Sequence, residues 1–231
     1  MRHSTAFQLL ALLHKGPTVL QALDDNEIRI LGCLIEKSIV TPDQYPLTLN
    51  ALTNACNQKS ARQPVMSLQP GEVQHVVRVL EAKHLVRMDE NFKSRTEKYS
   101  QRFCNTRYSD LHFEPAELAI VCLTMLRGPQ TPGELRSRSG RLHKFEDNAE
   151  VLSAINSLIE RDGGALLVKL PRTPGRKDSE YMHLFGGPID VEMHTSQAKA
   201  SGSADRVNMS ELVERVLKLE SDVAELKSRL Q

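Results

Sequence analysis

Hydrophobic residues recur at helical spacing in three successive segments of the first half of the chain. Each segment presents one apolar face, as expected of a helix that packs on a core. These faces consist of Ile28, Leu31 and Ile35, then Leu49, Leu52 and Cys56, and finally Val73, Val76, Val77 and Leu80. Asp24 or Asp25 is expected to cap the first helix, and Pro70 to open the third. Two strands, 85–88 and 98–103, are predicted to follow, around a polar turn at 89–97.

The second half of the chain shows the same order of helices and strands. Its first stripe is followed by Gly128-Pro129, which ends a helix, and Thr131 with Glu134 forms a capping-box pattern for a short second helix. Asp147 is expected to start the third helix. The inward residues are Leu118, Val121, Cys122 and Met125 in the first helix, and Val151, Ile155, Leu158 and Ile159 in the third. Strands are predicted at 165–170 and 181–185, around a turn at 171–179.

Short sequence matches indicate that the two halves arose by duplication. Glu27 to Leu31 matches Glu117 to Val121 at an offset of about 90 residues, and Thr41-Pro42 matches Thr131-Pro132 at the same offset. Before the first strands the offset falls to about 78, which predicts about a dozen extra residues between the second and third helices of the first copy. Three helices followed by a hairpin predict a winged helix. The predicted fold is therefore mainly α (α+β), with tandem winged-helix domains at 23–107, the first repeat, and 108–190, the second repeat.

A linker and a coiled coil are predicted after the second repeat. Residues 191–207 consist largely of small and polar residues such as Ser and Ala, whereas 208–231 carry a heptad pattern with Val at two of the four a positions and Leu at d. This pattern favours a parallel two-stranded coil and a homodimer. The predicted dimerisation residues are Met209, Leu212, Val216, Leu219, Val223, Leu226 and Leu230. The alternative is one amphipathic helix that packs back on its own chain.

Composition fits a cytoplasmic globular protein without a membrane span. Hydrophobic residues make up 40% and charged residues 26% of the 231 positions, and the net charge is +1. So small a charge attracts no polyanion by itself, and nucleic-acid binding would depend on local basic patches. The four cysteines, at 33, 56, 104 and 122, are expected to be reduced and structural. Residues 1–22 are interpreted as an N-terminal extension: an extra amphipathic helix, or the result of a start codon assigned too early.

No residue pattern typical of catalysis is found. The eight histidines lack metal-ligand spacing, since even His75 and His84, expected on one helix, are nine residues apart. Gly-rich phosphate loops and Gly-x-Ser-x-Gly motifs are absent from the sequence. The sequence therefore predicts a protein that is not an enzyme and that uses no metal or cofactor.

Basic and amide residues gather at three places in the first repeat, and together they form the candidate nucleic-acid-binding set. They lie in the loop after the second helix (Asn57, Gln58, Lys59 and Arg62), on the outward face of the third helix (Gln74, His75 and Arg78) and in or beside the wing (Lys93, Arg95 and Lys98). Such groups can neutralise phosphates or bind base edges. Because Glu72 and Glu81 share the third helix, an ordinary solvated face is the alternative.

The second repeat is a weaker candidate for reading DNA. Its third helix carries Asp147, Glu150 and Glu160, whose charges repel phosphate. Its second helix, the following loop and its wing are basic instead, with Arg136, Arg138, Arg141, Lys144, Arg172, Arg176 and Lys177. Contact with a nucleic acid through this repeat is expected to involve the backbone only. A protein partner at this repeat is the other interpretation.

Several motifs resemble those of the YceH-like family, an uncharacterised group of bacterial tandem winged-helix proteins. The stretches that carry the resemblance are 41–47, 55–59, 62–66, 98–105, 130–136 and 181–185, and it covers roughly residues 23–187. The resemblance implies the fold and a bacterial cytosol, and it brings no catalytic residues. Residues 1–22 depart from it, because such proteins usually begin near the first helix.

Two functions remain open at this point. The first is a dimeric protein that binds double-stranded DNA, such as a transcriptional regulator, in which the first repeat reads the DNA and the second clamps it or holds a partner. The second is a non-enzymatic scaffold or adaptor that uses the tandem winged helices for protein interactions. The near-neutral charge and the acidic third helix of the second repeat favour the latter.

Overall fold

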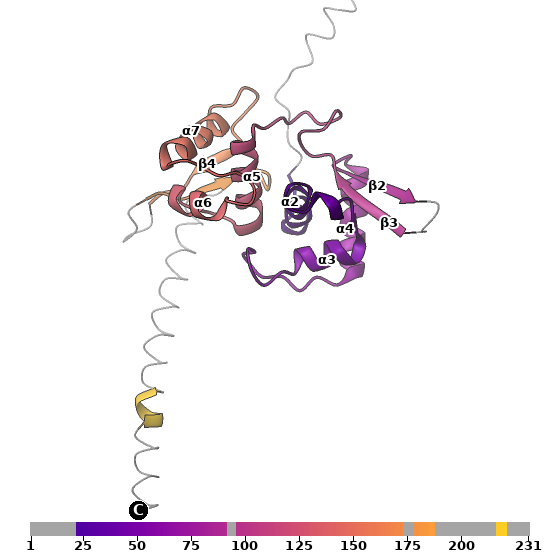
Figure 1. Ribbon diagram of the computed structural model, residues 1–231, viewed down its shortest axis with the longest axis horizontal. Coiled ribbons are helices and arrows are strands. Elements are labelled where there is room, and N and C mark those ends of the chain that lie inside the picture. The colour runs from indigo at the N-terminus through magenta and orange to yellow at the C-terminus, as the bar shows by residue number, and fades with distance from the viewer. Residues whose placement is uncertain (1–21, 92–95, 173–177, 188–215, 221–231) are drawn as a thin grey trace, which may run out of the picture. The chain divides into compact units, whose positions relative to one another are not determined.

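The computed structural model describes residues 22–91, 96–172, 178–187 and 216–220. It confirms a mixed α+β protein, mostly helical with small antiparallel sheets (Figure 1). The first repeat contains α2 (Asp25–Val40), η1 (Pro42–Gln44), β1 (Leu47–Thr48), α3 (Leu49–Cys56), α4 (Pro70–Ala82), β2 (Val86–Asn91) and β3 (Thr96–Gln101). The second contains α5 (Pro115–Arg127), α6 (Pro132–Arg138), α7 (Asn148–Ile159), β4 (Leu167–Lys169) and β5 (Tyr181–His183).

The chain divides into two compact units. The first comprises residues 1–170 and 178–188, and the second residues 171–177 and 189–231. Both repeats fall in the first unit, and the domain boundary near residue 107 stays a prediction. In the second unit residues 216–220 are helical, and Val216, Leu217 and Leu219 are exposed. The other predicted dimerisation residues (Met209, Leu212, Val223, Leu226 and Leu230), the predicted linker and residues 1–21 lie outside the described residues.

The first helices of the two repeats, α2 and α5, are buried on all sides. Every residue from 27 to 35 in α2 and from 119 to 126 in α5 is buried, so neither helix keeps a polar face along these stretches. They pack on each other, and Cys122 donates a hydrogen bond from its Sγ to the carbonyl of Gly32 (3.6 Å). A Cβ at Gly32 would lie 3.0 Å from Leu126 Cδ2, so glycine permits this close crossing. The predicted single apolar face of each helix was therefore incomplete.

The two helices also begin in the same way. Asp24 and Glu27 form a capping box at α2, and Glu114 and Glu117 form one at α5. Each capping glutamate is buried and contacts the end of its own repeat's third helix: Lys83 Nζ lies 2.5 Å from Glu27, and Ser157 donates a hydrogen bond to Glu117 (2.5 Å). These matching contacts support the predicted duplication.

The sheets contain one strand that the hydrophobic pattern did not predict. The short strand β1 pairs with β3, with Leu47 opposite Tyr99, and gives a three-stranded antiparallel sheet in the order β1-β3-β2. In the second repeat β4 pairs with β5, and an isolated bridge between Gln130 and Tyr181 lies where the first repeat has β1. Two residues are too few to produce a recognisable alternation in the sequence.

The structure corrects the register of the duplication after the first helix. Thr131 caps α6, but the residue that caps α3 is Thr48, and Thr41 instead ends α2. The extra residues of the first repeat are therefore divided, because η1 and β1 precede its second helix and only the remainder follow it. The match between Thr41-Pro42 and Thr131-Pro132 was misleading at this point.

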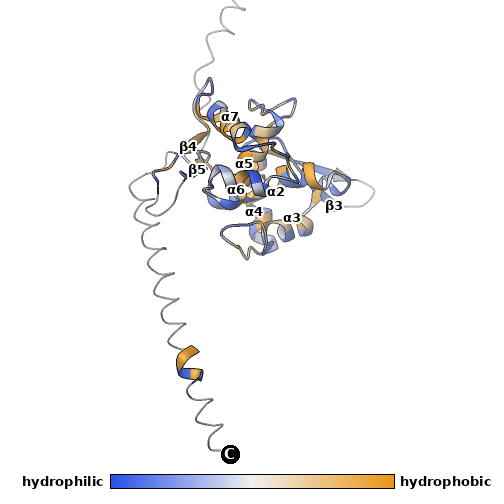
Figure 2. Cartoon of the chain, turned by 60° about the vertical axis from the view of Figure 1, so that its left-hand side comes forward, coloured by the Kyte–Doolittle hydropathy of each residue, from blue (hydrophilic) through white to orange (hydrophobic). Residues whose placement is uncertain are grey.

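One hydrophobic core runs through both repeats. Its buried members come from every helix of the first unit and include all four cysteines, which are free thiols. Figure 2 shows much of the hydrophobic colour on α5 and α7, whereas the loops that connect the helices are largely hydrophilic. Among the described residues, no helix has the length and apolar character that crossing a membrane would require.

Candidate nucleic-acid interface

The outward side of α4 is the best-formed part of the candidate interface. Val73, Val77 and Leu80 anchor the helix in the core, and the capping box of Gln69 and Glu72 fixes its start. On the opposite side lie four exposed residues at helical spacing, namely Gly71, His75, Arg78 and Ala82, with half-buried Gln74 beside them. The small residues at both ends leave His75 and Arg78 as the protruding groups of this strip.

Acidic residues lie beside this strip and not along its centre. The Glu72 carboxylate accepts a hydrogen bond from the backbone N–H of Gln69 (2.6 Å), so part of its hydrogen-bonding capacity serves the helix start. Glu81 is half-buried. Glu97, on β3, is also engaged, because its carboxylate accepts a hydrogen bond from the Tyr99 hydroxyl (2.5 Å). Glu72 and Glu81 lie on the flanks of α4. Their charges therefore repel phosphate less from the central strip than charges within the strip would.

The wing residues are only partly described. Lys98 is exposed on β3, directly opposite Asp89 of β2, and Asp89 is bound to Arg87 at 2.7 Å. Lys93 and Arg95 lie outside the described residues. Of the three cations predicted for this turn, Lys98 is therefore the one that lies within the described residues, exposed on β3.

The loop after α3 is held from within. The Asn57 side chain makes two hydrogen bonds with the backbone of Leu68, one as donor and one as acceptor, each 2.8 Å long. This clamp joins the two ends of the loop, and the amide is not free to bind a base edge. Gln58 is half-buried and Lys59 is exposed. Of the four candidate residues in this loop, Lys59 is the most accessible.

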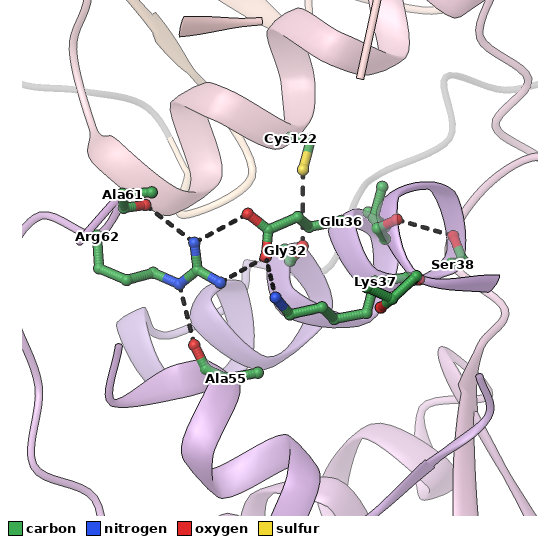
Figure 3. A network of polar contacts seen from close by, with 10 residues as sticks. Gly32, Glu36, Lys37, Ser38, Ala55, Ala61, Arg62 and Cys122 are labelled. Carbon is green, nitrogen blue, oxygen red and sulfur yellow. Dashed lines mark hydrogen bonds and ion pairs between the residues drawn. The ribbon is translucent and has the colours of Figure 1, made fainter. Parts of the chain in front are cut away.

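The prediction that Arg62 faces a nucleic acid is wrong, because its guanidinium is buried. Figure 3 shows it between the carboxylate of Glu36 and the carbonyls of Ala55 and Ala61. The bonds to the two Glu36 oxygens are 3.1 and 2.5 Å long, and the bond from Nε to Ala55 is 3.0 Å. A charged residue in a loop is usually exposed, but here it closes the end of α3.

Burial and pairing act against each other at this ion pair. Burial alone would raise the pKa of Glu36, but hydrogen bonds and charge from Arg62 offset it, so the carboxyl pKa lies below its usual value. The pKa of Arg62 is correspondingly raised by Glu36 despite burial. Both groups are therefore charged at neutral pH, and they stabilise each other.

Arg29 is a second buried arginine that the sequence analysis did not single out. Its Nη atoms donate to the carbonyls of Cys56 (3.1 Å) and Pro64 (2.7 Å), so Arg29, like Arg62, fixes the loop after α3. Its position between Ile28 and Ile30 in an apolar run was the available signal. Arg29 and Arg62 together satisfy carbonyls at the end of α3 that would otherwise lack donors.

The third helix of the second repeat differs in kind from α4. At an offset of 78 residues, Gln74, His75 and Arg78 correspond to Leu152, Ser153 and Asn156, all exposed. Leu152 is 39% exposed, and Glu150 is bonded to His143 at 2.9 Å. These three positions carry no cation, and the exposed Glu160 corresponds to Ala82, which makes this strip a poor surface for phosphate.

The described residues contain no group of His, Cys, Asp or Glu side chains that could hold a metal ion. Burial raises the pKa of Cys104 to about 12 and that of Cys122 well above its usual value, so both thiols remain protonated.

Comparison with known proteins identifies close relatives across most of the chain. A family described as "Protein of unknown function, DUF480" matches residues 23–176. A UPF0502 protein of Vibrio atlanticus is 49% identical over 211 residues, which cover 90% of this chain and 97% of the relative. A UPF0502 protein of Shewanella woodyi is 49% identical over 89% of this chain and 96% of the relative. The UPF0502 protein YceH of Salmonella agona is 48% identical over 90% and 94%, respectively.

Proposed function

The chain belongs to the UPF0502 (YceH) family of bacterial proteins of unknown function, and we propose that it is a dimeric DNA-binding protein with tandem winged-helix domains. The three helices and the antiparallel hairpin of each repeat are the basis for the domain type. The heptad at 209–230 is the basis for the dimer. A transcriptional regulator is the biological role that fits such a protein.

The exposed strip of α4 carries the proposal. An α-helix fits the major groove of B-DNA, where Arg can bind guanine O6 and N7 and phosphate contacts fix the register. Arg78 and His75 protrude from a helix that three core residues and a capping box hold in place. Lys98, on the neighbouring hairpin, is suited to a phosphate.

Duplication provides an internal comparison that favours the first repeat as the reader. The positions that carry Gln74, His75 and Arg78 in α4 carry Leu152, Ser153 and Asn156 in α7. The first repeat therefore offers a cation to phosphate at Arg78, where the second repeat has the uncharged Asn156. We assign base reading to α4 and a supporting role to the second repeat.

The test is a fluorescence-anisotropy titration with random duplex DNA at low and at physiological salt. The wild-type protein should bind, and its affinity should fall steeply with salt because counterions are released. Arg78→Ala should weaken binding by about tenfold, and Lys98→Ala should lower the salt slope by about 1. Arg87→Ala is the matched control for Arg78→Ala. Arg87 is an exposed arginine on the same hairpin as Lys98, but it is ion-paired with Asp89. Equal effects of the Arg78 and Arg87 substitutions would contradict the role of α4.

A protein-interaction scaffold is the second candidate, and exposed Leu152 favours it. A leucine at the centre of an uncharged helix face suits an apolar contact with another protein. If the wild-type protein binds no duplex even at low salt, a pull-down should compare it with Leu152→Glu. Loss of a captured partner on that substitution, and its retention with Leu152→Met, which keeps the side chain apolar, would favour the scaffold.

A further inference from the structure

A second group of cations lies where the first repeat meets the end of α5. The backbone N–H of Gln63 donates a hydrogen bond to the carbonyl of Leu126 (2.9 Å). This bond places Arg62 and Arg127, the neighbours of the bonded residues, at one junction. Arg138 lies near the same end of α5, because its guanidinium is bonded to Gln130, whose side chain donates to the carbonyl of Leu123 in α5.

Arg127 has no partner among the described residues. It is the last residue of α5 and half-buried, and its Nε is buried without a hydrogen-bond acceptor. The nearby carbonyls of α5 are already occupied: Thr124 accepts from Gly128, and Leu126 accepts from Gln63. Capping of the helix end therefore does not use this guanidinium. Burial lowers the pKa of Arg127, and the charges of Arg138 and Arg62 lower it further, whereas Glu36 and Glu134 act in the opposite direction.

Arg138 is held in position by a buried amide. Its Nη1 donates to Gln130 Oε1 (3.1 Å), and Gln130, which is fully buried, donates in turn to the carbonyl of Leu123 (3.0 Å). Glu134 lies 3.3 Å from the other Nη of Arg138, whose side chain remains 34% exposed. The buried amide fixes one side of the Arg138 guanidinium, and part of this side chain stays open to solvent.

The charges at the junction do not balance. The cations are Lys37, Arg62, Arg127 and Arg138, and the carboxylates are Glu36 and Glu134. Glu36 is shared by Arg62 and Lys37, and Glu134 is engaged with Arg138 and the N-terminus of α6. Within the described part of the chain, Arg127 and one of the other three cations therefore remain without a carboxylate of their own.

We propose that Arg127 and Arg138 bind a phosphate group. Guanidinium groups are well suited to phosphate because their donors match two of its oxygens at once. A bound anion would supply the missing negative charge and an acceptor for the unpartnered donors of Arg127. The phosphate comes from the backbone of the duplex bound by α4, a source that rests on the proposed function, or from a free phosphate compound.

The experiment compares two double variants of the full chain. Arg127→Gln/Arg138→Gln removes the proposed ligands, and Arg107→Gln/Lys169→Gln removes two exposed cations that belong to neither candidate set, with the same change of net charge. With random duplex DNA, the first variant should bind at least about tenfold more weakly, with a salt slope lower by about 2, and the control should change less than about threefold. An equal loss in both variants would overturn the proposal, because general charge would then explain it.

A second measurement separates this proposal from DNA binding by α4. The melting temperature is followed in pyrophosphate and in chloride at equal ionic strength. The site is supported if pyrophosphate raises the melting temperature of the wild type and of the control variant but not that of the Arg127/Arg138 variant. This holds even if no duplex binds, and the source is then a free phosphate compound. If the Arg127/Arg138 variant loses no more duplex affinity than the control variant does, and pyrophosphate does not raise the melting temperature of the wild type, the junction is not a phosphate site.

Discussion

A buried guanidinium closes the end of α3, and its partners explain why it cannot serve elsewhere. Arg62 makes four hydrogen bonds inside the protein, two of them with the carboxylate of Glu36. Removing one member of a buried pair costs more than the pair contributes, because the other charge is left without compensation. Arg62 is therefore a residue on which stability depends.

Arg62→Ala should lower the free energy of unfolding by about 3 kcal/mol. The Ala55 carbonyl loses its donor and half-buried Glu36 loses its bidentate partner. Urea unfolding at pH 7 measures the change. Lys59→Ala, in the same loop but exposed, should change stability by less than about 0.5 kcal/mol. If the two variants were equally stable, Arg62 would not have the structural role assigned to it.

His183 makes stability depend on pH. It is 4% exposed, stacks on Phe185 with ring centroids 5.4 Å apart, and its Nδ1 has no hydrogen-bond partner. Burial lowers its pKa to about 4 from 6.5. The folded state therefore binds a proton less readily than the unfolded state, so this contribution is present above pH 6.5 and is lost as the pH falls toward 4.

Between pH 7 and pH 5 the wild type should lose about 2 kcal/mol through this histidine. His183→Leu should remove that part of the pH dependence, whereas His112→Gln, at an exposed position, should preserve it. Urea unfolding of the three proteins at both pH values provides the comparison. Parallel losses in the wild type and the His183 variant would show that other groups cause the effect.

Residue type alone did not predict the contacts of two of the four candidate residues in the loop after α3. Asn57 and Arg62 have the donors that nucleic acids attract, but both bind backbone carbonyls of their own chain. Sequence reasoning correctly placed His75 and Arg78 on an exposed face, because helical periodicity fixes their position relative to Val73 and Val77. A loop has no such period, so the direction of its side chains depends on tertiary contacts.

The crossing of α2 and α5 depends on a single glycine. Gly32 interrupts an otherwise bulky stretch, and an added Cβ would lie 3.0 Å from Leu126 and 3.2 Å from Met125. A helix-interior glycine normally costs about 1 kcal/mol relative to alanine. Here close packing of two fully buried helices offsets that cost.

Gly32→Val should destabilise the protein by about 1–3 kcal/mol, because its branched side chain overpacks the crossing. Gly71→Val is a suitable control, since nothing lies within 4 Å of a Cβ at this position on α4. Thermal unfolding monitored by circular dichroism would compare the two variants. A Gly32 variant as stable as the control would mean that the helices separate at little cost.

At the level of elements, capping signals predicted more than hydrophobic spacing did. Asp24, Thr131 and Asp147 start helices as expected, and Gly128 ends α5 with a positive φ. Spacing alone did not reveal that Leu34 and Cys33 are buried as well as Ile28, because a helix enclosed on every side differs from a one-faced helix only in its tertiary partners. The two-residue strand β1 likewise exists only through its pairing with β3.

For the whole molecule, the dimer proposal depends on the heptad at the C-terminal end. Leu219 and Leu217 are both exposed in the helical residues 216–220, but only Leu219 occupies a predicted d position. Leu219→Glu should convert a dimer into a monomer, as measured by light scattering after size-exclusion chromatography, because a charge would enter the apolar seam. Leu217→Glu should leave the dimer intact. A monomeric wild type, or equal effects of both substitutions, would reject the coil.

The shared crossing of α2 and α5 has a consequence for how the protein is made. When a ribosome has completed the first repeat, α2 already carries the surface that α5 will cover, but α5 has not yet been synthesised. The nascent chain must keep this apolar surface from other partners until Arg127 has emerged, since domains otherwise fold in order of synthesis. The first repeat can therefore complete its packing only after the second repeat has been synthesised.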